Sequence, residues 1–176
     1  MKRILKGIWV VVFVLCALFV MVLMYSLSSE DGFTSSNRSN IVTESLKEEV
    51  KETLRSSPKG YSLAKRIKGY IILYSPYGSD WNLTMRKLAH FLIYFCMAFM
   101  IYLSLCMLSF GKGKRIVITL LICFFFACID EFHQGHIIGR TMSKKDVLIY
   151  LSGSSLSVLI LSLFKKLQDD GSCHLN

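Results

Sequence analysis

The sequence IVITLLICFFFACIDEFHQ, residues 116–134, decides how this chain folds. It carries no charge from residue 116 to residue 129 and then places two carboxylates, Asp130 and Glu131, side by side. A charged group inside lipid costs about 2.5–3.5 kcal/mol on insertion scales, so such groups face neighbouring helices and polar partners. The stretch therefore predicts a membrane-spanning helix whose carboxylates are covered by other helices of a bundle.

Three further stretches of the chain are similarly apolar and similarly long. A helix needs about 20 residues to cross a hydrocarbon core of about 30 Å. Hydrophobic residues make up 53% of the 176 residues, more than in a typical soluble domain, and the mean hydropathy is +0.47. We predict an all-α polytopic membrane protein that forms a single domain over residues 1–176. Its four transmembrane helices are expected at residues 8–28, 88–110, 116–136 and 146–164.

The formal net charge is +9, and its placement along the chain predicts the orientation in the membrane. Cytoplasmic loops of membrane proteins carry an excess of Lys and Arg. The short external loop would hold Arg140, Lys144 and Lys145, and the cytoplasmic side would hold Lys2, Arg3, Lys6, Lys112, Lys114, Arg115, Lys165 and Lys166. We expect a membrane protein with both termini in the cytoplasm. The lipid bilayer is its expected partner. Nucleic acid is not an expected partner, because charge divided in this way does not form a nucleic-acid-binding patch.

The segment between the first two helices, residues 30–86, is expected outside the membrane. Apolar residues repeat at helical spacing in its first half, which predicts a solvated amphipathic helix. These residues are Ile41, Val42, Leu46, Val50 and Leu54. A second amphipathic piece, with Ala64, Ile67, Ile71 and Tyr74, fits either a helix on the membrane surface or one packed against a neighbour. Residues 165–176 are expected to form a short polar cytoplasmic tail.

Polar side chains at the start of the second helix are expected to meet the carboxylates of the third. Arg86 and His90 are four residues apart and share a helix face, and Lys87 lies one turn before His90. Asp130 lies ~21 Å along its helix from residue 116, which places it in the outer third of the bilayer, level with His90.

The two carboxylates themselves are expected to point in different directions. Asp130 and Gln134 share one face of the helix, whereas Glu131 points about 100° away and serves a different neighbour. Buried carboxylates are paired with cations or take up a proton. The expected cationic partners are Arg86, His90 and Arg140.

The hairpin before the fourth helix combines a helix cap with basic residues. Ser143 and Asp146 fit a capping box, with Ser143 as the N-cap and Asp146 reaching back to its amide. The amino end of this helix, next to Arg140, is of the kind that binds anions, although Lys144 and Lys145 taken alone fit solvent-directed lysines. Gly153-x-x-x-Ser157 provides a face of small residues for close helix packing.

The six cysteines indicate neither a metal site nor a disulfide. Five lie in apolar stretches and Cys173 lies in the tail, and none has metal-ligand spacing. We interpret them as small core residues and expect no metal and no cofactor.

Three motifs in this order resemble the VanZ-like family of small multi-pass bacterial membrane proteins. They are Arg86-Lys87-Leu88-Ala89-His90-Phe91, Asp130-Glu131-x-x-Gln134, and Arg140-x-x-Ser143-x-x-Asp146-Val147 followed by Gly153. The resemblance covers residues 8–164, and His133 is not part of the family's pattern. It implies a location in the bacterial cell membrane and a role in the cell envelope, since the founding member is associated with low-level resistance to teicoplanin, a lipoglycopeptide. The family brings no agreed biochemical activity.

Three functions are compatible with these residues. The first is binding or handling of an anionic envelope lipid or cell-wall precursor at the outer leaflet. The residues expected to bind it are Arg86, Lys87, His90, Asp130, Glu131, Gln134, Arg140, Ser143 and Asp146. The second is a membrane-embedded enzyme in which His90 and either Asp130 or Glu131 form an acid/base pair. The third is a structural or partner-binding protein without chemistry. The lack of a nucleophile motif or an HExxH motif favours binding over catalysis.

Overall fold

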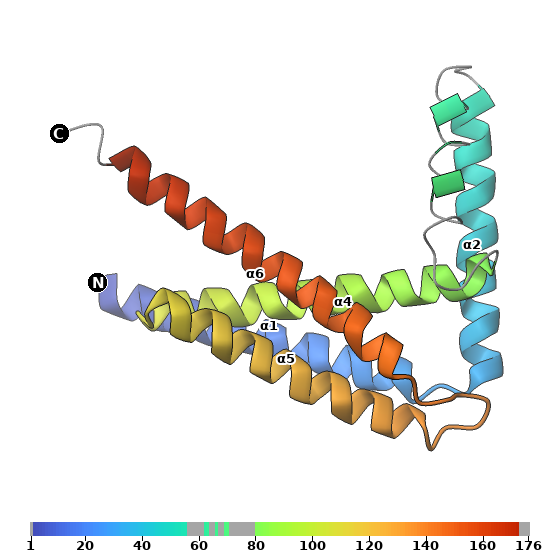
Figure 1. The fold of residues 1–176 in the computed structure, drawn as a ribbon, viewed down its shortest axis with the longest axis horizontal. Coiled ribbons are helices and arrows are strands. Elements are labelled where there is room, and N and C mark those ends of the chain that lie inside the picture. The colour runs from blue at the N-terminus through green and yellow to red at the C-terminus, as the bar shows by residue number, and fades with distance from the viewer. Residues whose placement is uncertain (1, 56–61, 64–65, 67–68, 71–79, 173–176) are drawn as a thin grey trace. The chain divides into compact units, whose positions relative to one another are not determined.

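The computed structural model describes residues 2–55, 62–63, 66, 69–70 and 80–172, and five long helices account for most of them. The helices are α1 (Lys2–Ser28), α2 (Gly32–Arg55), α4 (Trp81–Met107), α5 (Lys112–Gln134) and α6 (Lys144–Ser172), as Figure 1 shows. No strand occurs among the described residues. The all-α prediction is therefore confirmed.

Four of these helices are long and apolar enough to cross a membrane. The candidate spans are Ile4–Ser28, Leu83–Met107, Lys112–Gln134 and Lys144–Phe164. Large apolar side chains are exposed along the spans, most of all on α1, where Leu15, Phe19 and Val22 are each more than half exposed. Apolar surface of this extent marks contact with lipid or with a partner. The four predicted transmembrane helices are thus present.

The helix ends differ from the predicted spans by a few residues, for local reasons. The second helix ends at Met107 instead of 110, because Ser109 takes a left-handed φ of 61° and the Phe110 amide turns back to the Leu105 carbonyl at 3.2 Å. The third begins four residues early, at Lys112. The fourth continues to Ser172, through part of the predicted tail, since no Gly or Pro interrupts the chain between Phe164 and Gly171.

The chain divides into two compact units. The first comprises residues 1–29 and 90–176 and contains α1, α5, α6 and α4 from His90 onward. The second comprises residues 30–89 and contains α2. A helix was predicted there, and the described α2 exposes Ile41 and Val42 of the predicted apolar face. Its position outside the membrane stays a prediction. The second amphipathic piece, with Ala64, Ile67, Ile71 and Tyr74, lies outside the described residues.

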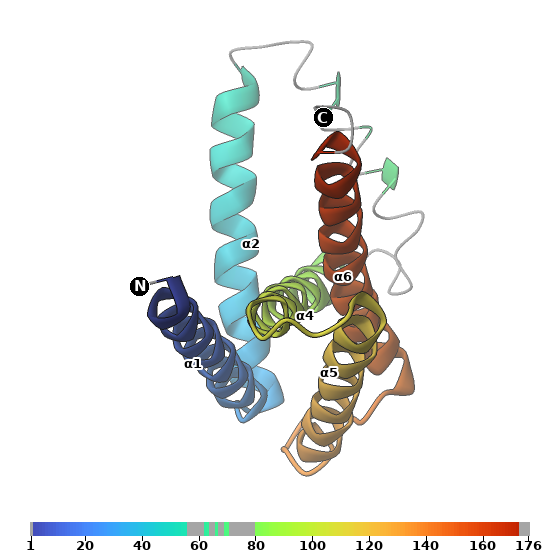
Figure 2. The same cartoon turned by 90° about the vertical axis from the view of Figure 1, so that its left-hand side faces the viewer.

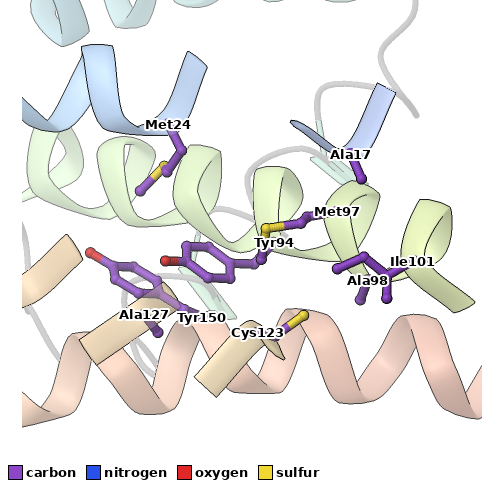
Figure 3. Packing of buried hydrophobic residues seen from close by; sticks show 9 residues of the cluster. All are labelled: Ala17, Met24, Tyr94, Met97, Ala98, Ile101, Cys123, Ala127 and Tyr150. Atoms are coloured by element: carbon purple, nitrogen blue, oxygen red, sulfur yellow. The ribbon is translucent and has the colours of Figure 1, made fainter. Parts of the chain in front are cut away.

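In the first unit, successive helices run in opposite directions. Figure 1 shows α1 and α5 running one way and α4 and α6 the other, and Figure 2 shows the end at which α4 connects to α5. α5 packs against both α6 and α1. All four helices contribute buried side chains to one core (Figure 3). Its members are Ala17, Met24, Tyr94, Met97, Ala98, Ile101, Cys123, Ala127 and Tyr150.

The small-residue face of α6 brings this helix close to α4, as predicted. A Cβ atom at Gly153 would collide with the backbone carbonyl oxygen of Phe91, so only glycine fits. Ser154 and Ser157 are fully buried, and the Ser154 hydroxyl donates to the Tyr94 carbonyl oxygen at 3.5 Å. Because helices in lipid gain little from hydrophobic association, such close packing is a principal source of their affinity.

We expect Gly153→Ala to lower the thermal midpoint of the purified protein in mild detergent by several degrees or to prevent folding, because the atom it meets is backbone and cannot rotate away. Gly113→Ala is the matched control. A Cβ at Gly113 meets nothing within 4 Å, so this variant should unfold at the parent temperature or slightly above it. Equal midpoints for the two variants would contradict the close α4–α6 contact.

The start of α2 is capped by Asp31. Its carboxylate accepts hydrogen bonds from the Thr34 amide at 2.8 Å and from the Thr34 hydroxyl at 2.7 Å. Both bonds favour the ionised form, and the backbone bond contributes most to holding the pKa of Asp31 below its usual range.

A carboxyl titration of Asp31 by NMR in detergent micelles should therefore give a pKa below the ordinary value of about 3.9. A lowered pKa means that the cap stabilises α2 at every pH above that ordinary value. This stabilisation is lost only as the pH falls through the lower folded-state pKa. Amide exchange at Thr34 should rise over the same range in the parent. Asp31→Asn keeps a capping side chain that does not titrate, so its exchange should show no such step. A pKa at or above 3.9 would exclude this cap.

Candidate functional site

The two carboxylates of α5 point toward different helices, as predicted. Asp130 is 2% exposed, and its Oδ2 accepts a hydrogen bond from Gln134 Nε2 at 2.8 Å. The same amide nitrogen donates to Ser28 Oγ on α1 at 3.1 Å. Asp130 and Gln134 therefore form one polar group that joins α5 to the end of α1.

Glu131 is equally buried, and it accepts hydrogen bonds from α6 and from Ser143, the residue before α6. Its Oε1 accepts from the Tyr150 hydroxyl at 2.8 Å, and its Oε2 accepts from the Ser143 amide at 2.9 Å. Asp146 was predicted to accept a hydrogen bond from the Ser143 amide, but Glu131 of α5 accepts it instead. The amide of Asp146 itself bonds to the Ser143 carbonyl at 3.0 Å. Glu131 thereby fixes the start of α6.

An aromatic stack connects His90 to this second carboxylate. The His90 ring lies 5.2 Å from the Tyr150 ring with an interplanar angle of 18°, and Tyr150 in turn stacks on Tyr94 at 4.8 Å and 7°. Figure 3 shows Tyr94 and Tyr150 side by side with their hydroxyls toward the same end. The pairing of His90 with Asp130 or Glu131 as an acid and a base stays a prediction.

Tyr150 is the site residue that the sequence argument missed. It is fully buried, it bonds to Glu131, and it is the centre of the aromatic stack. A signal was present, since Asp146, Tyr150, Gly153 and Ser157 follow one another at helical spacing on one face of α6. A tyrosine on the small-residue face packs into the bundle, where its hydroxyl needs a partner.

Arg140 joins the loop between α5 and α6 to the end of α1. Its guanidinium donates to the Leu27 carbonyl oxygen at 3.1 Å, where a cation also interacts favourably with the helix dipole. Gly139, with a φ of 75°, supplies the left-handed turn just before it. Arg140 and His133 lie near enough to Asp130 to act on it electrostatically. The pairing of Arg140 with a carboxylate stays a prediction.

Several buried polar atoms of this cluster have no hydrogen-bond partner among the described residues. They are Asp130 Oδ1, the Tyr94 hydroxyl and His133 Nδ1. Buried polar atoms are normally satisfied by protein or by bound water. The cluster therefore has free hydrogen-bonding capacity in its interior.

Arg86 and Lys87 belong to the part of α4 assigned to the second unit. Lys87 is buried and Arg86 is half-buried. Their position beside the carboxylates stays a prediction. In the part of the chain that the structure describes, no group of three or more His, Cys, Asp or Glu side chains is arranged to hold a metal ion.

The family model described as VanZ/LLP1 matches residues 12–165. The chain belongs to the VanZ/LLP1 family. The match covers the first candidate span from residue 12 onward and the other three spans completely, and it includes every predicted site residue, which confirms the resemblance found in the sequence. No curated protein and no solved structure matches the chain.

The hydrogen bond between Tyr150 and Glu131 is expected to stabilise this VanZ/LLP1 protein measurably. Tyr150→Phe should lower the free energy of unfolding by about 1–3 kcal/mol, because it removes a hydrogen-bond donor from a buried carboxylate. Tyr94→Phe is the matched control, since it also removes a fully buried tyrosine hydroxyl, but one without a hydrogen-bond partner. Reversible unfolding in detergent should show little loss for this variant. A larger loss for Tyr94→Phe than for Tyr150→Phe would contradict the assignment.

Proposed function

We propose that this protein binds an anionic envelope lipid or a cell-wall precursor at the outer leaflet of the bacterial cell membrane. The observation that carries the proposal is the buried cluster around Asp130, with its unused hydrogen-bonding atoms, next to a half-buried arginine. Lipid-linked precursors combine a phosphate with a head group rich in hydroxyl and amide donors. The cluster contains an arginine that would bind the phosphate and polar oxygens that would bind the head group.

The positive part of the cluster would hold the phosphate. Arg140 is half-buried beside the end of α1 and carries the positive charge that a phosphate would meet. The amino end of α6 begins at the neighbouring Lys144, and the side chains of Lys144 and Lys145 are exposed. A helix amino end and an arginine together form a favourable environment for a phosphate.

The negative part would hold the uncharged portion of the head group. Asp130 Oδ1 accepts hydrogen bonds from hydroxyl or amide groups, and the Tyr94 hydroxyl can donate or accept. A carboxylate that accepts from a ligand also repels ligands without donors, which provides selectivity. A protein that binds the precursor in this way would limit access of teicoplanin-type lipoglycopeptides to it, and we propose a contribution to resistance on this basis.

The orientation in this proposal follows from the distribution of basic residues. The inner side would hold both termini and the connection between α4 and α5, and the outer side would hold the Arg140 loop. Both termini are then cytoplasmic.

Arg140→Gln should reduce at least tenfold the amount of lipid-linked cell-wall precursor that co-purifies with the protein, because it removes the charge that meets the phosphate. Quantitative mass spectrometry of lipids extracted from protein purified in mild detergent measures this. Lys6→Gln, which removes an exposed charge from α1, is the control and should retain the parent's lipids. Asp130→Asn should retain phosphate binding but change which head groups are enriched. Unchanged lipid content in Arg140→Gln would refute the proposal.

A further inference from the structure

A second polar cluster lies where α4 ends and α5 begins, at the other end of the first unit. We call it the Arg115 cluster, and it consists of Tyr102, Cys106 and Arg115. Arg115 is 5% exposed, its Nη1 donates to Cys106 Sγ at 2.7 Å, and its guanidinium lies 5.4 Å from the centre of the Tyr102 ring. A buried guanidinium normally has an anionic partner, because removing a charge from water is costly.

No carboxylate provides that partner among the described side chains. Arg38–Glu30 and Lys47–Glu44 are ion pairs of the second unit, and neither involves Arg115. On α5 itself the nearest carboxylate is Asp130, 15 residues away and therefore about 22 Å along the helix. Arg115 Nε and the Tyr102 hydroxyl are both buried without a hydrogen-bond partner. The cluster thus contains one positive charge and two unused polar groups.

Capping of α4 does not account for Arg115. Basic residues often hydrogen-bond the last carbonyls of a helix, but these carbonyls of α4 already have backbone partners. Ser104 O accepts from Leu108 N at 3.1 Å, Leu105 O from Phe110 N at 3.2 Å, and Cys106 O from Ser109 N at 3.1 Å. The guanidinium donates to a thiol sulfur instead, which is a weak acceptor.

The amino end of α5 adds to the same positive field. Its first turn contains Lys112 and Lys114 but no acidic residue, and the N-cap Gly111 provides no side-chain hydrogen bond. The helix dipole makes this end positive, so cations here are unfavourable unless an anion is bound. Arg115 is the fourth residue of this helix and donates to Cys106 Sγ of α4, so its charge adds to the positive amino end of α5.

We propose that the Arg115 cluster and the amino end of α5 bind the phosphate of an anionic phospholipid. Arg115 provides the charge and its free Nε–H, the Tyr102 hydroxyl provides a second donor, and the exposed Lys112 and Lys114 attract the head group from the membrane surface. The acyl chains would lie on exposed apolar side chains beside the cluster, such as Leu108 and Val117. This site lies at the membrane face where α5 begins, the inner leaflet in the proposed orientation. It does not depend on the function proposed for the Asp130 cluster.

The test is thermal unfolding of the full-length protein in a neutral detergent with graded additions of short-chain phosphatidylglycerol. Phosphatidylcholine of the same chain length and inorganic phosphate are the two comparison probes. Phosphatidylglycerol should raise the unfolding temperature saturably, and the other two probes should not. If inorganic phosphate produces the whole shift, or if phosphatidylcholine does, the lipid assignment is overturned.

Variants locate the effect. Arg115→Gln should weaken phosphatidylglycerol binding at least tenfold, and Arg115→Lys should restore part of it. Tyr102→Phe keeps the ring beside the guanidinium and removes only an unpaired hydroxyl, so it should fold and bind about threefold more weakly. Arg140→Gln should bind phosphatidylglycerol as the parent does, which separates this site from the Asp130 cluster. Parent-like affinity in both Arg115→Gln and Tyr102→Phe would overturn the proposal.

Discussion

The two buried carboxylates of α5 are the constraint on which the rest of the structure depends. In an apolar environment each needs hydrogen-bond donors, and adjacent residues on a helix point about 100° apart. One neighbouring helix therefore cannot satisfy both. One oxygen of Asp130 accepts from Gln134, which also donates to Ser28 on the side of α1, and Glu131 accepts from Tyr150 and the Ser143 amide on the side of α6. The pair thus sets the rotation of α5 and determines which helices flank it.

The close contact between α4 and α6 makes the second half of this arrangement possible. Gly153 allows the backbones to approach, and Tyr150, one turn earlier on α6, then lies between the aromatic rings of α4 and the carboxylate of α5. Packing and hydrogen bonding are linked here, because the same Tyr150 side chain stacks on rings of α4 and donates to Glu131 of α5. In a membrane, where hydrophobic association between helices is weak, this linkage gives the bundle one defined arrangement.

The two ends of the first unit differ in electrostatic character. The end with the Asp130 cluster contains carboxylates, hydroxyls and one arginine, so it suits a ligand that has both a phosphate and hydrogen-bond donors. The end with the Arg115 cluster contains cations and no carboxylate among the described side chains within reach, so it suits a simple anion. The two proposed sites would engage head groups in opposite leaflets.

The sequence by itself determined the class of protein, the four membrane helices to within a few residues of most of their ends, the family, and the opposite directions of Asp130 and Glu131. These features depend on local periodicity and hydrophobicity, which are properties of one segment at a time. Only the tertiary structure decided the partners: Tyr150 for Glu131, the Leu27 carbonyl for Arg140, and Glu131 instead of Asp146 for the Ser143 amide. Periodicity gives the face on which a residue lies, but not the height and rotation of the helix opposite, which depend on how all the helices pack together.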